Sequence, residues 1–569
     1  MDMAKMTTAQ HVESISAGYA FDGLAVNLGA ALVDGQVFPE AQVRLPLRMM
    51  NRHGLVAGAT GTGKTITLQL MAEQLSAHGV PVFLADIKGD LTGLSTPGTA
   101  TEKLTERTAS VGMKWQAKSF PVEYYALGGD GQGTPIRATI SSFGPLLLSR
   151  IMELNETQES CLQLIFHYAD TKDLELHDLK DLRAVIQHLT SDEGKDELEG
   201  LGGVSKATAG VILRELVTLQ SQGMESFFGE PEFDTAELLR QAPDGRGVIS
   251  ILELPTLMQK PLLFSTFMIW LLADLFSELP EAGDPEKPKL VFFLDEAHLL
   301  FNDASKAFLT SITSTVRLIR SKGVGVFFVT QTPKDVPGDV LGQLANRIQH
   351  ALRAFTPDDA KALKATVSTF PTSEYDLDQA LTQAGTGEAV VTVMNEKGAP
   401  TPVAWTRMWS PESTMGPSSP DTVSGIIASS ALMQVYGTSV DRESAYEKIN
   451  GTSTEATAAP VPTGGSVAAR VPGPGQSQAD IDAAARNIEE SILGRPSSLP
   501  NSAPQPGASD YTMPEPPVAT TGSPKRQTKA PAPAQNPDNP LLDMALQAAN
   551  IFGREMLRGM FGTKRRRRR

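Results

Sequence analysis

The chain has 569 residues, of which 41% are hydrophobic and 6% aromatic, and its formal net charge is −15. This length exceeds one small module and allows a sizeable buried core. The acidic balance excludes a protein whose whole surface is a basic nucleic-acid coat, although it leaves room for a local basic track. The last six residues, 564–569, are all basic, and subtracting their charges from −15 leaves −21 for the rest of the chain.

A single cysteine, Cys161, excludes an intramolecular disulfide and a zinc site built on paired cysteines. The N-terminal residues lack the long apolar run of a secretory signal, so we expect a cytoplasmic protein. The most apolar window, 261–276, is shorter than the roughly 20 residues that span a bilayer, and it contains Asp274. We interpret this window as a core helix.

Taken in chain order, residues 20–48 are typical of short strands and turns. From Leu55 the pattern changes to a strand, a glycine-rich loop and a helix, and a second strand follows at 80–86. Residues 144–242 have a mostly helical period. Continuous apolar runs then alternate with helical segments, and residues 388–409 have the alternation and turn of a hairpin. Such runs are typical of strands buried on both faces of a mainly parallel sheet, so we predict an α/β fold; they lie at 247–254, 289–297, 323–331 and 347–355.

The composition changes near residue 450, beyond which Pro, Ala, Ser and Gly dominate. Such a segment buries too little apolar surface to offset chain entropy, so we predict a disordered linker. The final stretch regains a helical period, with arginines off its apolar stripe. The predicted division is 1–48, a short N-terminal β segment; 49–143, the first half of an α/β core; 144–242, a helical insertion; 243–410, the second half of the core; 411–450, a C-terminal extension; 451–539, the linker; and 540–569, a basic amphipathic helix.

The strongest motif is GATGTGKT, which matches G-x-x-x-x-G-K-[ST] in full between a predicted strand and a predicted helix. Glycines let backbone N–H groups surround phosphate oxygens, and the helix N-terminus adds a favourable dipole. Lys64 would neutralise the terminal phosphates of ATP, and Thr65 would bind Mg²⁺. A chance glycine-rich turn is a poor alternative because both flanks fit. The predicted nucleotide-binding residues are Gly58, Ala59, Thr60, Gly61, Thr62, Gly63, Lys64 and Thr65.

The second motif is KLVFFLDE at 289–296, an apolar strand that ends in two adjacent carboxylates. Open α/β sheets bind ligands at this edge of the sheet. We predict that Asp295 holds Mg²⁺, directly or through water, and that Glu296 activates the attacking water. The alternative is an ordinary solvated strand end. No HExxH spacing supports a metal role for His298, which we interpret as structural or adjacent to the nucleotide.

Three weaker signals accompany these motifs. Gln331 ends the strand at 323–331, where it would contact the γ-phosphate or the attacking water, or simply form a turn. Arg317 and Arg320 share one helix face, which suits phosphate stabilisation or ordinary solvent exposure. Asp86 follows the strand at 80–86 and would join the Mg²⁺ or water network, whereas Lys88 could equally face solvent.

Together these motifs resemble the HerA-like ATPases of the FtsK–HerA class, through NRHGLVAGATGTGKT, FLADIKGDLTGL, VFFLDEAH and RLIRSKGVGVFFVTQTPKDV. The resemblance covers roughly residues 20–450 and includes a bacterial branch with similar TPIRATISSFGPLLLSRIMELNETQ and YGTSVDRESAYEKI segments. It implies a RecA-like P-loop NTPase core that forms a hexameric ring and pumps double-stranded DNA with ATP and Mg²⁺. By matching position it implies these roles: Lys64 and Thr65 as the P-loop pair, Asp295 and Glu296 as the Walker B pair, Gln331 as the sensor glutamine, Arg317 and Arg320 as arginines that reach a neighbour's nucleotide, and Asp86 as the acidic residue after the second strand.

The resemblance is not complete. Residues 1–48 are short for the N-terminal barrel that docks a nuclease in archaeal HerA, which argues against a nuclease partner. Two functions therefore stand beside each other: a ring-forming ATPase motor on double-stranded DNA, and an ATP-driven switch or scaffold that acts on protein partners. A conjugation-type coupling ATPase is a weaker third interpretation. Residues 540–569 would bind a protein partner or an anionic surface such as lipid or DNA.

Overall fold

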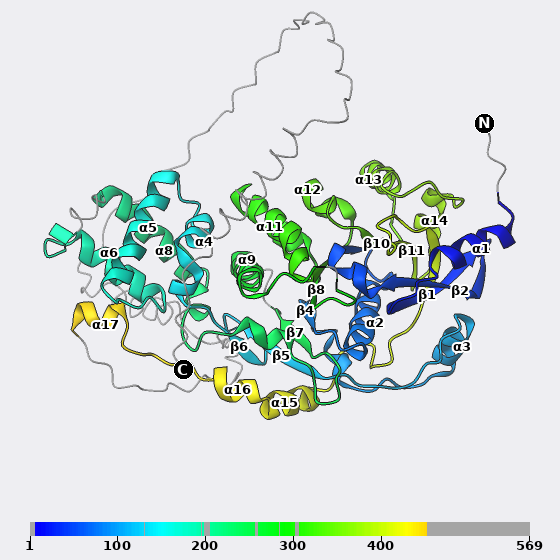
Figure 1. Ribbon diagram of the computed structural model, residues 1–569, viewed down its shortest axis with the longest axis horizontal. Coiled ribbons are helices and arrows are strands. Elements are labelled where there is room, and N and C mark those ends of the chain that lie inside the picture. The colour runs from blue at the N-terminus through cyan, green and yellow to red at the C-terminus, as the bar shows by residue number, and fades with distance from the viewer. Residues whose placement is uncertain are drawn as a thin grey trace, which may run out of the picture. The chain divides into compact units, whose positions relative to one another are not determined.

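The computed structural model describes residues 6–451 except 130, 195, 198–204, 256–259, 284 and 302–305 (Figure 1). The predicted basic helix at 540–569 and the predicted linker, apart from residue 451, lie outside the described residues. Among the helices of the described ranges, none combines the length and hydropathy needed to cross a bilayer.

A mixed sheet of 12 strands forms the centre of the described part of the chain, in the order β2-β1-β12-β11-β10-β3-β9-β8-β4-β7-β5-β6. The prediction of an α/β fold on a mainly parallel sheet is confirmed, because the strands from β10 to β6 in this order pair in parallel. The strands are β1 (Ala25–Val33), β2 (Gln36–Pro46), β3 (Gly54–Ala57), β4 (Val82–Asp86), β5 (Val122–Leu127), β6 (Thr134–Ile136), β7 (Ile249–Glu253), β8 (Leu290–Leu294), β9 (Val324–Thr330), β10 (Asn346–His350), β11 (Glu388–Thr392) and β12 (Ala404–Met408).

The predicted hairpin at 388–409 forms β11 and β12, and it does more than close on itself. β11 pairs with β10 and β12 pairs with β1, so antiparallel strands continue the parallel sheet beyond β10. β2, at the end of that extension, pairs only with β1 among the described strands. The N-terminal strands therefore belong to the central sheet.

Alternate side chains of the central strands enter two separate apolar cores. Phe292 and Leu294 of β8 face the core that contains helices α9 (Pro261–Glu278) and α11 (Lys306–Ile319). Phe293 of β8 faces the opposite core, which contains α2 (Lys64–Ala77). Because both faces are covered, these strands carry continuous apolar runs. The interpretation of 261–276 as a core helix is confirmed, since Trp270 at its centre is only 2% exposed.

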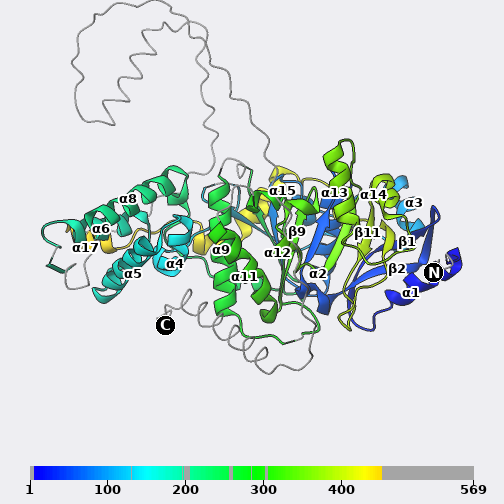
Figure 2. The same cartoon turned by 90° about the horizontal axis from the view of Figure 1, so that it is seen from above.

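The helical stretch predicted within 144–242 contains α4 (Ile140–Ile151), α5 (Glu156–Thr171), α6 (Leu179–Thr190) and α8 (Lys206–Ser221), which lie side by side in both views (Figures 1 and 2). Asn155 and Asp178 start α5 and α6 with capping boxes. α17 (Ala445–Asn450) packs on α6, where the Tyr446 N–H donates to Asp181 at 3.0 Å. The chain thus returns to its helical stretch near residue 445.

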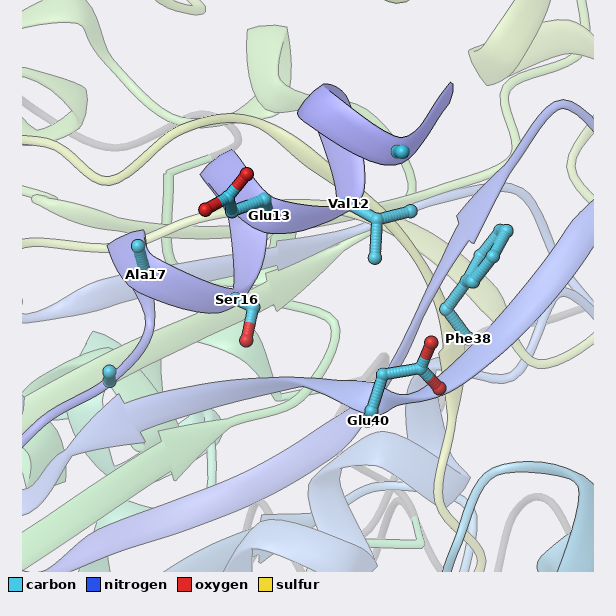
Figure 3. Close-up of a pocket in the computed structure, with 8 residues that line it drawn as sticks. Val12, Glu13, Ser16, Ala17, Phe38 and Glu40 are labelled. Carbon is cyan, nitrogen blue, oxygen red and sulfur yellow. The ribbon is translucent and has the colours of Figure 1, made fainter. Parts of the chain in front are cut away.

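The N-terminal segment also contains a helix that the sequence pattern did not predict, α1 (Thr8–Gly18), which a capping box of Thr7 and Gln10 starts. A shallow groove of about 510 Å³ lies between α1 and β2 (Figure 3). Its lining includes none of the predicted site residues. The remaining described helices are α3 (Glu102–Ser110), α10 (His298–Phe301), α12 (Gly338–Leu341), α13 (Pro357–Val367), α14 (Leu377–Gln383), α15 (Pro420–Ser429) and α16 (Ala431–Tyr436).

Candidate active site

The predicted motifs meet at one edge of the sheet. β3, β9, β8 and β4 are consecutive parallel neighbours, so their carboxyl ends lie at the same edge. The P-loop follows β3, Gln331 follows β9, and the carboxylate pair follows β8. The loop after β4 completes the edge. Ligands bind at such an edge in open α/β sheets, which makes this the candidate active site.

Two glycines of the P-loop are required by geometry. Gly58 has φ 156°, and a Cβ there would come within 2.5 Å of the His350 Cβ. Gly63 has φ 112° at the N-cap of α2, in the region that favours glycine. The backbone then ties the loop to its surroundings, with Ala59 N–H donating to the Ala351 carbonyl at 2.8 Å. The loop is therefore anchored to the residue that follows β10.

Lys64 lies inside the P-loop. Its ammonium donates to the carbonyls of Gly58 at 2.7 Å and Ala59 at 3.3 Å. Burial lowers the pKa of Lys64, while the nearby Glu296 and Asp295 carboxylates oppose that change. A buried cation that bonds only carbonyls of its own loop is placed to exchange them for phosphate oxygens.

The carboxylate pair is buried but the two groups differ. Burial raises the pKa of Asp295 to about 6. Burial also acts to raise the pKa of Glu296, but hydrogen bonding and charge from Lys88 outweigh it and hold that pKa below its usual range. The Lys88 Nζ lies 2.7 Å from Glu296 Oε1 and 3.8 Å from Asp295 Oδ2. His298 Nδ1 lies 3.2 Å from Glu296 Oε2. The pKa values of the two adjacent carboxyl groups are thus shifted in opposite directions.

The loop after β4 contains two acidic residues with different surroundings. Asp86 accepts hydrogen bonds from the backbone N–H groups of Lys88, Gly89 and Leu91, at 3.1, 2.8 and 2.9 Å. Burial raises the pKa of Asp86 to about 6. Its side chain therefore organises the loop, and its contribution to a Mg²⁺ or water network stays a prediction.

Asp90 is the acidic residue of this loop that faces the P-loop. Burial raises the pKa of Asp90, and the Lys88 charge and a hydrogen bond with the Thr65 side chain oppose that rise. The sequence pattern favoured Asp86 because it ends the strand. The side chain that turns toward Thr65 lies four residues further on, after a turn at Gly89 whose φ is 71°.

The oxygen atoms at this edge suit Mg²⁺. Asp90 Oδ1 and Asp295 Oδ2 are buried without a hydrogen-bond partner, and the Thr65 hydroxyl lies beside Asp90. Within the described ranges, no group of three or more His, Cys, Asp or Glu side chains is placed to hold a metal ion alone. Mg²⁺ in nucleotide sites uses one or two protein oxygens together with phosphates and water, so the residues present fit.

Gln331 lies at the same edge and its side chain is exposed. The turn that follows is held by Asp335, which accepts from the Thr330 hydroxyl at 2.6 Å and from the Thr332 N–H at 3.1 Å. These bonds fix the end of β9 without using the Gln331 amide. The position of Gln331 is therefore compatible with a sensor, and that role stays a prediction.

Arg317 and Arg320 do not join this site. They lie at the end of α11 and in the following 3₁₀ turn η6 (Arg320–Lys322), just before β9 begins, so they stand at the amino edge of the sheet. The seven residues of β9 separate the two edges by about 23 Å. Both side chains are exposed. Within one chain these arginines cannot reach the P-loop.

Two further residues support the site and were not found from the sequence. His350 at the end of β10 contacts the Thr67 hydroxyl at 3.0 Å and the Glu388 carbonyl at 2.9 Å, under the first turn of α2. Burial lowers the pKa of His350 to about 4. The sequence pattern left open whether Lys88 faces solvent, whereas in the structure its Nζ lies 2.7 Å from Glu296 Oε1. Neither residue belongs to a motif, and their roles depend on which strands become neighbours.

A glycine-rich loop with a buried lysine lies at the same edge of a parallel sheet as a pair of consecutive carboxylates. This combination defines a P-loop ATPase. The chain belongs to the family described as Helicase HerA-like C-terminal, whose match extends over residues 33–491. This confirms the HerA-like resemblance.

Solved structures with a similar fold include plasmid coupling protein TrwB with the ATP analogue ADPNP, at 16% identity, 69% of this chain, 97% of that chain and a TM-score of 0.45. TrwB with ADP and Mg²⁺ gives 16% identity, 70% and 97% coverage, and a TM-score of 0.44. VirB4 of Thermoanaerobacter pseudethanolicus gives 14% identity, 71% and 98% coverage, and a TM-score of 0.41. No curated protein matches the chain.

Proposed function

We propose that this chain hydrolyses ATP with Mg²⁺ at the edge formed by β3, β9, β8 and β4. The observation that carries the proposal is the convergence of Lys64, Asp295 and Glu296 on the P-loop. Lys64 would bind the β- and γ-phosphates, and Thr65 and Asp295 would hold Mg²⁺, which supplies charge neutralisation when bound. Glu296, already charged, would accept the proton of the attacking water.

The motor proposed here acts on double-stranded DNA as a ring of identical subunits. Two observations support a ring: membership of the HerA-like family, and the placement of Arg317 and Arg320 at the sheet edge opposite their own P-loop. An arginine at that edge serves catalysis only if it faces the nucleotide of another subunit. The acidic surface confines DNA contacts to local sites such as a central pore.

The direct test is ATPase activity with and without duplex DNA over a range of salt concentrations, beside mass determination in ATP. We expect hydrolysis that rises with duplex DNA, a rise that shrinks as salt increases, and a mass near six subunits. Hydrolysis with no response to any DNA at low salt would contradict the DNA motor and leave the ATPase assignment standing. A chain that stays monomeric in ATP would contradict the ring.

The second candidate is an ATP-driven switch or scaffold acting on protein partners, favoured by the charge of −21 outside 564–569. This charge repels the DNA backbone over most of the surface. Under this proposal, ATP turnover is indifferent to DNA, and the predicted helix at 540–569 binds a specific protein. Comparing DNA stimulation in the full chain and in a chain ending at residue 539 separates the two, because only the motor keeps its DNA response in the core.

A further inference from the structure

The loop that links β10 to α13 carries a large apolar side chain in solvent. Phe355 is 84% exposed, whereas the other large apolar side chains that are exposed in the described ranges reach at most 60%. A single exposed ring can be ordinary surface, so its surroundings decide what it does. Aromatic rings that a partner covers are frequent anchors of protein interfaces.

The backbone around Phe355 is fixed by the start of α13. The Phe355 N–H donates to Asp359 Oδ2 at 3.2 Å, beside the Thr356 N–H at 2.9 Å, within the capping box of this helix. An apolar residue in this position often packs against the fourth residue of the helix. That residue is Ala360, which is itself exposed, so this packing contact is not made. The ring is thus presented to solvent from an ordered backbone.

The same loop borders the P-loop. Ala351, at its start, accepts from the Ala59 N–H at 2.8 Å, and the Arg353 guanidinium donates to the Thr60 carbonyl at 3.4 Å. Thr60, at the tip of the P-loop, is exposed. A partner that covers Phe355 would therefore also lie against the tip of the P-loop.

The charges at the two edges of the sheet indicate which partner fits. The five residues before each of β3, β8 and β9 contain five basic residues and one acidic residue: Arg52, Lys287, Lys289, Arg320 and Lys322 against Glu286. The five residues after each of these strands contain three acidic residues and one basic residue: Asp295, Glu296 and Asp335 against Lys334. Lys64, two residues beyond this count, is buried inside the P-loop. Opposite charges on opposite edges favour contact between the amino edge of one copy and the carboxyl edge of the next, and such head-to-tail contacts can close into a ring.

We propose that Phe355 anchors the amino edge of a second copy of this chain, which docks on the loop at 351–356 and covers the P-loop. The proposal rests on the proposed ATP-hydrolysing ring and names the surface at which its subunits meet. It also accounts for the divided site, because docking there would bring Arg317 and Arg320 of the partner subunit to the edge that carries the phosphate loop.

The test is the mass of the full chain over a range of concentrations, with Mg²⁺ and a β,γ-imido ATP analogue. Phe355→Ser should raise the concentration for half-maximal assembly at least about tenfold, because an aromatic anchor is lost. Its free energy of unfolding should equal that of the wild type, because the ring is exposed in the single chain. Phe355→Leu should retain most of the assembly, because it keeps an apolar side chain. Lys289→Glu should weaken assembly by reversing a charge on the docking edge.

The matched control is Val435→Ser, which should assemble like the wild type. Val435 is 60% exposed on α16, which contacts β6 at the end of the sheet remote from β10. Normal assembly of Phe355→Ser would overturn the anchor and leave the ring standing, and a loss of analogue or duplex DNA binding by that variant would then identify the ligand that Phe355 contacts instead. Normal assembly of Lys289→Glu would overturn the amino edge as the docking surface. A wild type that binds the analogue and stays monomeric would overturn both the ring and the anchor.

Discussion

At the scale of single residues, Glu296 is the proposed base, and its backbone is unusual. Its φ of 46° lies in the left-handed region, which costs a residue with a Cβ about 1–3 kcal/mol. Asp295, one residue earlier, is not among the residues with positive φ. The two neighbouring carboxylates also differ in their distance from Lys88, whose Nζ lies 2.7 Å from Glu296 Oε1 and 3.8 Å from Asp295 Oδ2. Such strain is retained where the surroundings fix the geometry.

Glu296→Gln should bind ATP as tightly as the wild type or more tightly, and should slow hydrolysis about 10²–10⁴-fold. The amide keeps the size of the side chain but cannot accept the proton of the attacking water. Single-turnover hydrolysis beside retention of radiolabelled ATP after gel filtration measures both properties. Lys64→Ala is the companion variant and should lose binding itself. Normal turnover by Glu296→Gln would show that another group is the base.

Changing Asp86 to Asn and changing Asp90 to Asn should have different effects, the first on stability and the second on the Mg²⁺ requirement. Asp86→Asn puts an amide among three backbone N–H donors, so we expect a loss of about 1–3 kcal/mol in the free energy of unfolding, measured by urea denaturation. Asp90→Asn should leave stability nearly unchanged and raise the Mg²⁺ concentration needed for half-maximal ATPase. The reverse pattern would place Asp86 in the Mg²⁺ site and Asp90 in the loop scaffold.

Motif residues could be predicted from the sequence because phosphate chemistry fixes both their types and their spacing. Lys64, Asp295 and Glu296 meet as expected. Lys88 and His350 could not be predicted, because each acts on a residue more than 200 positions away in the chain. Their roles follow from the strand order, which brings β4 beside β8 and β10 beside β3.

At the scale of elements, the P-loop helix is fastened by the segment that follows β12. Glu73 of α2 accepts from the backbone N–H groups of Glu412 at 2.7 Å and Ser413 at 2.9 Å. Gln69, one turn earlier, donates to the Thr414 carbonyl at 2.8 Å. Burial raises the pKa of Glu73 to about 7, against the opposing effect of these hydrogen bonds. The helix that carries Lys64 therefore depends on a buried carboxylate.

The fastening of α2 should depend on pH. The folded state holds the Glu73 proton up to about pH 7, whereas the unfolded chain releases it near pH 4.5, so folding binds a proton between these values. Stability from this group is therefore greatest at low pH and is lost as pH rises through 7. Between pH 6 and 8 the wild type should lose about 1 kcal/mol relative to Glu73→Gln in urea denaturation. A parallel pH dependence of the two proteins would contradict this assignment.

Strands with a continuous apolar run could also be predicted from the sequence. The pairing of strands that are distant in the chain could not. The central strands carry continuous apolar runs because both faces are covered, and this property is visible in the sequence. The pairing of β1 with β12 joins residues such as Ala30 and Arg407, and no local pattern encodes it. α1 was missed although Thr7 and Gln10 form its capping box, because its apolar stripe is short.

At the scale of the whole molecule, one chain does not contain a complete proposed site. Arg317 and Arg320 stand at the amino edge of the sheet, on the far side from the P-loop of the same chain. The Arg320 charge is close enough to act on His53, which begins the P-loop strand at that amino edge. The same strand thus begins near the arginine and ends at the phosphate loop. In the proposed ring, the two edges of one subunit would therefore contribute to two different sites.

This division predicts complementation between inactive chains. Arg320→Ala should hydrolyse ATP poorly alone, because each site loses its neighbour's guanidinium, and Lys64→Ala should not hydrolyse it at all. In an equal mixture, about a quarter of the interfaces should pair an intact P-loop with an intact Arg320 and regain activity. The measurement is the ATPase rate after the two proteins are unfolded together and reassembled.

The control mixture contains Lys64→Ala and Glu296→Gln, whose altered residues belong to the same site of one chain. No pairing of these two proteins creates a site with both residues intact, so their mixture should stay inactive while the first mixture recovers. Recovery in both mixtures would show contamination by wild-type chain, or would show that Lys64 and Glu296 of different chains act on the same nucleotide. Failure of the first mixture, in an assembly whose mass shows mixed rings, would mean that Arg320 does not act across the interface, and the amino-edge arginine would then be a structural partner of β3.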